Sequence, residues 1–486
     1  MNKKLLRDSA LFSFSRYVLM GMSFIRNFVV ARVLDPENYG YWVIVTIVLA
    51  YGDQIHLGLR HAGDKEIPYL QGQGRSDESQ RTANTIFGGV LLLSGAALAV
   101  LGGFVLITGN TGEGLERMIF LAGLIVFMEQ INRYYLMIMR VKRLFVFSMK
   151  VEIITEAFRT LLVCVLVYYF SIWGAIVGFL AGALFMMFYA IAHFKKEFVP
   201  KLDRRLLGRL FNLGFSLFGV SLVFVALINA DRLFGATVLS KAELGIYGVA
   251  ALAAQLPLNF TQGISSVVYS TLSETFGKSN DVAALSPLSL SVLSSLSFAI
   301  PLIAGTTYFG STFLISLFLP VYMGSLKILA ILLPGVFFLA FVPFLSGLFT
   351  VANRARQFLV LELFVAVCSV LLFVGLQKFS PGPEGVGIAM TAGMLLYAAT
   401  AIVAAFRLFS IGPVETVRRI AGIYWPSLYC MIVVGVILNT IGNEADPMSA
   451  LIGYAMFLLA SIPLVIVASR VLDLRKMFNV LRSSHG

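Results

Sequence analysis

Charged residues are scarce in this sequence of 486 residues. Asp, Glu, Lys and Arg make up 13% of the chain and hydrophobic residues 58%, whereas soluble domains carry about 25% charged residues. The mean hydropathy is correspondingly high, at +0.88. This composition excludes a water-soluble globular protein, because too few polar residues are available to cover its surface. It also excludes a disordered chain.

Cysteine and the common catalytic motifs are scarce as well. The three cysteines (Cys164, Cys368 and Cys430) lie far apart in apolar runs, so the sequence predicts small buried side chains and no disulfide framework or metal site. The sequence contains no GxxxxGK[ST] loop, no CxxC pair and no cluster among its four histidines. We therefore expect no metal, no cofactor and no ATP hydrolysis on this chain, and we predict that it is not an enzyme.

What the sequence has instead is a series of long apolar segments. A membrane-spanning helix requires about 20 apolar residues, and the connections between these segments are too short to form a soluble catalytic domain. The sequence therefore predicts an all-α, multi-pass membrane protein of fourteen transmembrane helices. They are expected at residues 9–32, 37–59, 83–108, 117–139, 146–169, 173–193, 208–233, 243–266, 284–307, 326–350, 357–377, 385–406, 420–440 and 449–469.

The distribution of basic residues predicts the orientation. If the N-terminus is cytoplasmic, most of the 37 Lys and Arg residues fall in cytoplasmic connections, as the positive-inside rule requires. Both termini are then cytoplasmic. The net charge of +12 is explained by these anchoring residues beside anionic lipid, so no nucleic-acid partner is expected. Arg16 and Arg26 interrupt the first apolar segment, which argues against a cleaved signal peptide.

An internal repeat divides the predicted helices into two halves. A shift of 205 residues places Ala31, Val33, Leu34 and Gly40 on Ala236, Val238, Leu239 and Gly245. The two copies run in the same direction through the membrane, and parallel repeats of this kind are typical of transporters. The basic segment 195–209 is predicted to be a cytoplasmic linker. It separates a six-helix lobe at 1–194 from a second at 210–409, and residues 410–486 add two further helices and a cytoplasmic tail.

The repeated segments resemble a known superfamily. The motif ARVLDPENYGYW at 31–42 resembles the start of the polysaccharide-exporter and oligosaccharide-flippase branch of the multidrug/oligosaccharidyl-lipid/polysaccharide (MOP) superfamily. Its counterpart in the second half is NADRLFGATVLSKAELGIYGVA, followed by LPVYMGSLKILAILLP, FTVANRARQF and GVGIAM. The resemblance covers essentially the whole chain. Because the motifs consist mostly of Gly, Pro and apolar positions, they identify the fold better than the substrate.

The resemblance implies both an architecture and an activity. The two six-helix lobes would face each other in a V, and the protein would lie in the bacterial inner membrane. It would move an undecaprenyl-pyrophosphate-linked oligosaccharide from the inner to the outer leaflet by alternating access, for O-antigen, capsule or exopolysaccharide synthesis. Membrane lipids, a glycan polymerase and export machinery are the expected partners.

Polar residues on the first predicted helix are the leading candidates for substrate binding. Arg16, Ser23 and Asn27 fall on one side of this helix, and Arg26 lies at its edge. A buried guanidinium is costly in lipid, so it usually faces a cavity or a partner, and its forked donors suit a pyrophosphate. We therefore predict that this face lines the central cavity. For Arg26, an alternative is that the side chain extends to the outer interface.

Further charges occur on two other predicted helices. Glu129 and Arg133 lie four residues apart on one, and Glu152, Glu156 and Arg159 share one face of the next. Ion pairs within each helix would explain both sets structurally. Alternatively, Arg133 and Arg159 contact the substrate. Glu129 and Glu156 would then act in gating or ion coupling.

Isolated ionisable residues are candidates for a gate or for coupling to H⁺ or Na⁺. Asp53 and His56 lie in the second predicted helix and Glu362 in the eleventh. Asp231 and Arg232 end the seventh, where the 205-residue shift aligns them with Arg26 and Asn27. Carboxylates and histidines inside transporter helices often carry protons or cations, so each residue has a testable role.

Three other functions remain possible at this point. A lipid II flippase and a multidrug cation extruder belong to the same superfamily. The extruder requires negative charge in its cavity, whereas the first predicted helix carries Arg16 and Arg26. A membrane-embedded glycan polymerase or acyltransferase belongs to another class, and it requires a large external loop or a His/Asp site that the short outer connections do not provide.

Overall fold

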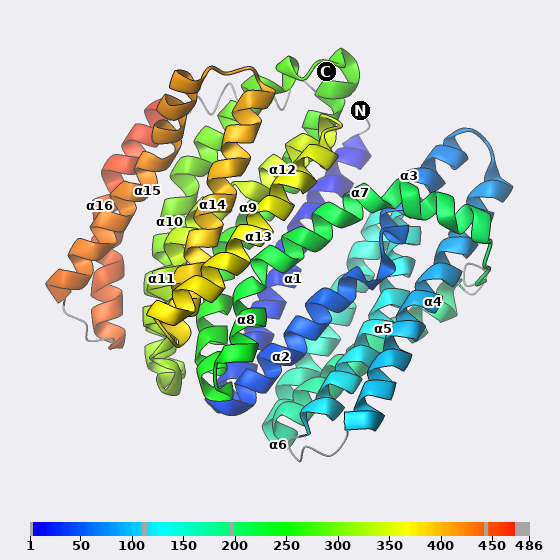
Figure 1. Cartoon of the computed structure of the whole chain (residues 1–486), viewed down its shortest axis with the longest axis horizontal. Helices are drawn as coiled ribbons and strands as arrows, with labels where there is room; N and C mark the ends of the chain where they lie inside the picture. Colours follow the sequence, from blue (N-terminus) through cyan, green and yellow to red (C-terminus); the bar gives the residue numbers. More distant parts are fainter. Residues whose placement is uncertain (1–2, 109–113, 195–198, 442–445, 472–486) are drawn as a thin grey trace. The chain divides into compact units, whose positions relative to one another are not determined.

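The computed structural model describes residues 3–108, 114–194, 199–441 and 446–471. The regular secondary structure of these described residues is helical (Figure 1). Contacts divide the chain into two compact units. The first unit contains Asn2–Ala236 and Ser240–Gly245, and the second contains Thr237–Leu239 and Ile246–Gly486. The all-α, multi-pass fold predicted from the sequence is confirmed.

The first unit is built around α5, which packs against α4 and α6, while α1 lies along α6. Tyr134 of α5 is fully buried, and its hydroxyl donates to the carbonyl of Ala83 at 3.1 Å. α7 packs against α3 and α4 and so belongs with this unit. The helices are α1 (Lys3–Val33), α2 (Pro36–Gly52), α3 (Leu59–Gly72), α4 (Ser76–Thr108), α5 (Leu115–Val141), α6 (Phe145–Phe194), α7 (Arg204–Ile228) and α8 (Ala230–Val238).

The long α6 is a hairpin of two helices. Ser171 has φ 53° and ψ −140°, which breaks the helix. A Cβ added to Gly174 would lie 1.9 Å from the carbonyl oxygen of Leu166, and one added to Gly178 would lie 2.8 Å from Cα of Val163. Gly178, which follows Gly174, contacts Val163, which precedes Leu166. The two arms of the hairpin are therefore antiparallel. Small residues spaced four apart permit this close approach, and the two predicted helices at 146–169 and 173–193 are its arms.

The two copies of the internal repeat contact each other at matching positions. A Cβ on Gly40 would lie 1.9 Å from the carbonyl oxygen of Lys241, and a Cβ on Gly245 would lie 1.9 Å from that of Pro36. The 205-residue shift converts Pro36 into Lys241 and Gly40 into Gly245. The contact is therefore self-complementary, like an isologous interface between identical subunits. This symmetry supports the repeat inferred from the sequence.

In the second unit, α10 packs against α15 and α16, and α14 packs against α11 and α13. Phe457 of α16 is fully buried in a cluster with Phe298, Phe309 and Cys430. The predicted burial of the cysteines is confirmed for Cys430, whereas Cys164 and Cys368 are only partly buried. The helices are α9 (Lys241–Ser279), whose first residues belong to the first unit, α10 (Ser286–Phe318), α11 (Ser325–Leu339), α12 (Val342–Val351), α13 (Ala355–Phe379), α14 (Pro383–Leu408), α15 (Pro413–Ile441) and α16 (Pro447–Val471).

Fewer helices are long and apolar enough to span a membrane than the fourteen predicted from the sequence. In the described residues, nine helices are long and apolar enough to cross a membrane, or up to eleven if each of two bent pairs is one span. The hairpin α6 counts once in this total, although it contains two predicted helices. Fourteen spans, the linker at 195–209 and the lobe boundaries stay predictions. Residues 195–198 and the tail at 472–486 lie outside the described part of the chain.

Candidate functional site

An ion-paired network joins three helices of the first unit. Arg26 of α1 pairs with Glu156 of α6, and its Nη2 atom also donates to Ser23 Oγ at 2.9 Å. The Arg26 guanidinium lies 4.6 Å from the ring centroid of Phe179, also on α6. Its side chain is only 7% exposed. Arg26 is therefore held between α1 and α6, in a buried pair that stabilises their packing.

Arg159 extends this network to α5. It pairs with Glu129 of α5, and its Nη1 lies 3.4 Å from Oε2 of Glu156. The same Phe179 ring lies 5.4 Å from the Arg159 guanidinium. The order of contacts is thus Arg26, Glu156, Arg159 and Glu129. Positive and negative groups alternate, which offsets much of the desolvation of each.

Arg16 lies in a more open position on the same helix as Arg26. Its Nη1 atom is 3.1 Å from Oε2 of Glu152 on α6, and 43% of its side chain is exposed. The sequence suggested no partner for Arg16 within its own helix, and the structure supplies one from α6. The Arg16 side chain therefore stays partly exposed while it pairs with Glu152.

Asp53 lies where the second predicted span breaks. α2 ends at Gly52, a 3₁₀ turn covers Asp53–His56, and α3 begins at Leu59 after left-handed residues at Leu57 (φ 45°) and Gly58 (φ 89°). The two helices differ in direction by 42°. The span predicted at 37–59 is therefore interrupted close to its end, because Gly58 permits a backbone conformation that other residues rarely adopt.

The break leaves backbone carbonyls that neighbouring side chains satisfy. Gln130 Nε2 donates to the carbonyls of Gly52 at 2.8 Å and Asp53 at 3.2 Å. Arg60 donates to the same Asp53 carbonyl at 2.7 Å and lies 3.1 Å from its carboxylate. Buried backbone groups need such partners. Arg60 and Gln130 thus hold the break, and the sequence analysis identified neither of them.

Arg133 of α5 approaches the same carboxylate. Its Nε lies 3.6 Å from Oδ1 of Asp53, and half of its side chain is exposed. Arg133 also interacts electrostatically with Glu129, Glu152 and Glu156. Arg16 and Arg133 are close enough to repel one another. These two partly exposed arginines, one on α1 and one on α5, are therefore neighbours.

Together these residues form what we call the arginine cluster. It contains five arginines and four carboxylates, so one positive charge is in excess. Its members are Arg16, Arg26, Arg60, Arg133, Arg159, Asp53, Glu129, Glu152 and Glu156. Because the carboxylates all face arginines and two guanidinium groups remain exposed, the cluster is suited to bind an anion.

Two predicted groups have local structural partners. His56 is buried, and its Nδ1 accepts a hydrogen bond from the Gly58 backbone at 3.0 Å, which places its proton on Nε2. In α8, Asp231 is buried and accepts from the backbone N–H of Arg232 at 2.7 Å, while Arg232 donates to Asn229 at 2.7 Å. These contacts fix helix ends, and a role in a gate stays a prediction. The same is true of Asn27.

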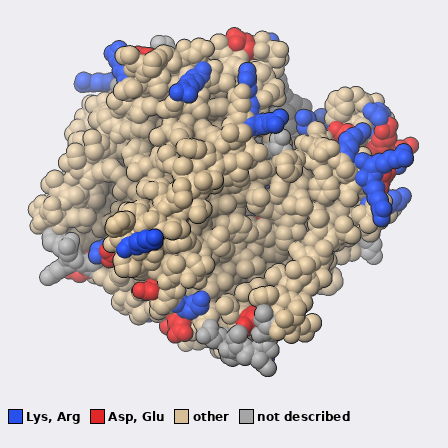
Figure 2. Space-filling view, viewed as in Figure 1, with Lys and Arg blue, Asp and Glu red and all other residues tan. Residues whose placement is uncertain are grey.

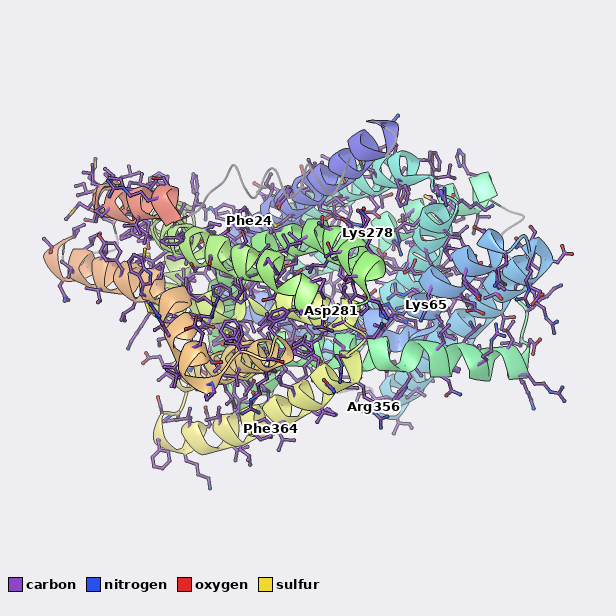
Figure 3. All side chains as sticks on the ribbon, turned by 90° about the horizontal axis from the view of Figure 1, so that it is seen from above. Phe24, Lys65, Lys278, Asp281, Arg356 and Phe364 are labelled. Atoms are coloured by element: carbon purple, nitrogen blue, oxygen red, sulfur yellow. The ribbon has the colours of Figure 1, made fainter. Side chains whose placement is uncertain are left out.

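A second group of ion pairs lies outside the arginine cluster, over α3 and the adjoining ends of α4 and α7 (at the right of Figure 2). Arg209 of α7 lies 2.5 Å from Glu66 of α3, and Arg81 of α4 pairs with Asp203 before α7. These pairs join helices near their ends. Lys65, on the same helix as Glu66, is labelled in Figure 3.

Glu362 lies in the second unit and does not belong to the arginine cluster. It is fully buried on α13 and accepts a hydrogen bond from the Tyr397 hydroxyl of α14 at 2.5 Å. In the described part of the chain, no group of three or more His, Cys, Asp or Glu side chains is arranged to hold a metal ion.

Comparisons with known proteins identify the family. The sequence model of the family described as "Polysaccharide biosynthesis protein" matches residues 29–321, and no curated protein sequence matches the chain significantly. The structure is similar to the lipid II flippase MurJ in an inward closed conformation, with a TM-score of 0.71, 16% identity and coverage of 95% of this chain and 99% of that one.

Two other solved structures have the same fold. An inward-facing multidrug resistance MATE family transporter of the MOP superfamily matches with a TM-score of 0.68 and 14% identity, over 82% of this chain and 98% of its own. A MOP superfamily transporter from Pyrococcus furiosus, described as having a binding pocket of reverse polarity, matches with a TM-score of 0.60 and 16% identity, over 83% and 96%. The chain is thus a multi-pass membrane protein with the MOP transporter fold, and it belongs to the polysaccharide biosynthesis protein family.

Proposed function

We propose that this protein is a flippase for an undecaprenyl-pyrophosphate-linked oligosaccharide. It moves the headgroup from the inner to the outer leaflet of the bacterial inner membrane by alternating access, with both termini in the cytoplasm. The product supplies O-antigen, capsule or exopolysaccharide synthesis, and the partners are membrane lipids, a glycan polymerase and export machinery. The membership in a polysaccharide biosynthesis family and the MOP fold support this proposal.

The observation that carries the proposal is the excess positive charge of the arginine cluster. A pyrophosphate brings several negative oxygens, and guanidinium groups bind such oxygens in pairs. Arg16 and Arg133 have partly exposed side chains with carboxylate partners at 3.1 and 3.6 Å, and we infer that an incoming pyrophosphate competes with those partners. Arg26 and Arg159 are buried in ion pairs and hold the surface in place.

The charge balance of the arginine cluster also argues against binding of a lipophilic cation at this site. An extruder of lipophilic cations needs a carboxylate without a positive partner. Asp53, Glu129, Glu152 and Glu156 each face an arginine, so the cluster offers no such group. A lipid II flippase would bind the same undecaprenyl-pyrophosphate group. The flipping assay therefore compares the lipid-linked oligosaccharide with lipid II.

The test measures flipping in proteoliposomes with an external enzyme that modifies only glycans in the outer leaflet. We expect Arg16→Ala and Arg133→Ala to abolish modification of internal oligosaccharide lipid. Arg419→Ala is the matched control, because Arg419 is partly exposed in an ion pair with Glu415 in the other unit. Full activity of both cluster variants would refute the proposed site. Transport of lipid II alone would reassign the substrate, and efflux of lipophilic cations without glycan movement would refute the flippase.

A further inference from the structure

Glu362 is a carboxyl group that the arginine cluster does not explain. It lies on α13, at the outer edge of the second unit, where Figure 3 labels Arg356 and Phe364. Phe364 and Val360 are exposed on the outer side of this helix, whereas Glu362 is 0% exposed on the side that packs against α14. Both helices are long and apolar enough to span a membrane. The carboxyl group is thus enclosed between two membrane helices.

The surroundings of Glu362 contain one polar partner. The Tyr397 hydroxyl donates to Oε1 at 2.5 Å, while Oε2 is buried and has no hydrogen-bond partner in the described part of the chain. α12 packs against both helices and has no charged residue. On the other neighbours, Lys327 of α11 pairs with Glu384, and Arg419 of α15 pairs with Glu415. The remaining charged residues of α13 and α14 lie near the helix ends: Arg356, Lys378 and Arg407.

This arrangement suits a proton better than a metal cation. Cations bound by proteins are surrounded by several oxygen ligands, and here Tyr397 and Glu362 supply the polar side-chain atoms. Tyr397 already directs its hydroxyl hydrogen at the carboxylate, so it presents a donor where a cation needs an acceptor. An ionised carboxylate with one donor is strongly disfavoured in apolar surroundings. A proton on Oε2 removes the charge and needs no further ligand.

The two helices are also closely packed beside this group. A Cβ added to Gly393 of α14 would lie 2.9 Å from Oγ and 3.6 Å from Cβ of Ser369 on α13. On the other side, the Phe358 and Tyr397 rings have centroids 6.3 Å apart. Glu362 is 0% exposed and its Oε2 atom is buried in this closed arrangement, so an ionised Glu362 requires entry of water or a new donor.

We propose that Glu362 is a proton-binding site, and that the proton leaves only when α13 and α14 separate. The inference deepens the proposed transport function and rests on it in one step: release of the proton accompanies the change between the inward-open and outward-open states. The ligand is H⁺, bound as a neutral carboxylic acid that accepts a hydrogen bond from Tyr397.

Infrared spectroscopy of the reconstituted full-length protein tests the bound proton directly. At neutral pH we expect the carbonyl stretch of a buried protonated carboxyl group, and we expect Glu362→Gln to remove this band. Glu384→Gln is the matched control, because Glu384 is exposed at the start of α14. Tyr397→Phe should shift the band to higher frequency, since it removes the donor to Oε1. The absence of the band from the wild type, or its persistence in Glu362→Gln, would overturn the proposal.

A disulfide tests whether release requires helix separation. The 3.6 Å between Cβ positions at 369 and 393 lies within the range of disulfides, so Ser369→Cys with Gly393→Cys should lock the helices together. Cys164, Cys368 and Cys430 are replaced by alanine in this variant. We expect exchange of the carboxyl proton for deuterium to be at least about tenfold slower when oxidised than after reduction, because exchange requires local opening. Equal rates would overturn the gating step.

The coupling step is measured as flipping under an imposed pH gradient. Wild-type and Glu384→Gln rates should respond to the gradient, and the Glu362→Gln rate should not. A wild-type rate that ignores the gradient would overturn the coupling. If the wild type flips no glycan lipid, the proposed function fails, while the infrared band and its deuterium exchange still decide whether Glu362 binds a proton.

Discussion

Arg16 and Arg26 lie on the same helix, yet their removal should affect folding differently. Arg26 is 7% exposed and pairs with Glu156, whereas Arg16 is 43% exposed and pairs with Glu152. Removing one partner of a buried pair costs about 3–5 kcal/mol. Arg26→Ala should fall near the lower limit, because Glu156 keeps Arg159 at 3.4 Å. Removing a solvent-exposed pair costs about 0–1 kcal/mol. Arg16→Ala should cost somewhat more than that but less than Arg26→Ala, because Arg16 is partly exposed whereas its partner Glu152 is only 9% exposed.

The measurement is the free energy of unfolding in mixed micelles, followed by fluorescence as a denaturing detergent is titrated. We expect Arg26→Ala to lose about 3 kcal/mol and Arg16→Ala a smaller amount, about 1–2 kcal/mol. Arg26→Lys should recover part of the loss, since the charge is kept but the forked geometry is not. Equal losses for the two alanine variants, or a larger loss for Arg16→Ala, would refute the distinction between a structural and an accessible arginine.

Three further predictions concern the backbone and the first unit. Gly58→Ala should destabilise the protein by about 1–3 kcal/mol in the same titration. Gly58 has φ +89°, and a Cβ added there would lie 2.8 Å from the Gly214 carbonyl oxygen. Unchanged stability would contradict this prediction. Gly178→Leu should prevent closure of the α6 hairpin and reduce the folded yield in size-exclusion chromatography, whereas Gly435→Leu, which has open space around it, should fold normally. For Asp203, the N–H of Leu206 and then the Arg81 guanidinium lower the pKa. The stabilisation is present above the unfolded-state pKa and is lost as the pH falls through the folded-state value, so the stability difference from Asp203→Asn should shrink on acidification, and a pH-independent difference would be evidence against this pairing.

The helical segments could be predicted because apolar length and Gly positions are local properties of the sequence. Each predicted segment overlaps helical structure, and the break between 146–169 and 173–193 falls at Ser171. The repeat was visible for the same reason, since its glycines are needed where backbones touch. Residues 31–42 and 229–250 therefore indicated both the family and a contact later seen at Gly40 and Gly245.

The pairing of charges could not be predicted, because it depends on which helices are neighbours. Glu129 and Arg133 are correctly spaced for a pair within one helix, but Glu129 contacts Arg159 and Arg133 approaches Asp53. Burial of Arg26 is likewise determined by α6, a helix distant in sequence. Arg60 was missed because its link to Asp53 crosses the break at Gly58, and Arg60 lies just outside the span predicted at 37–59.

The distance along the chain between Arg26 and Glu156 has a consequence for biosynthesis. The two residues are 130 positions apart, and Arg16 and Glu152 are separated by a slightly longer stretch of chain. At about 5–20 residues per second, a ribosome needs roughly 6–26 s to add 130 residues. During that interval α1 carries two guanidinium groups without their carboxylates, and lipid is an unfavourable environment for them. We therefore expect α1 to be among the last helices of its unit to enter the bilayer, remaining hydrated or held by insertion machinery until α6 has been synthesised.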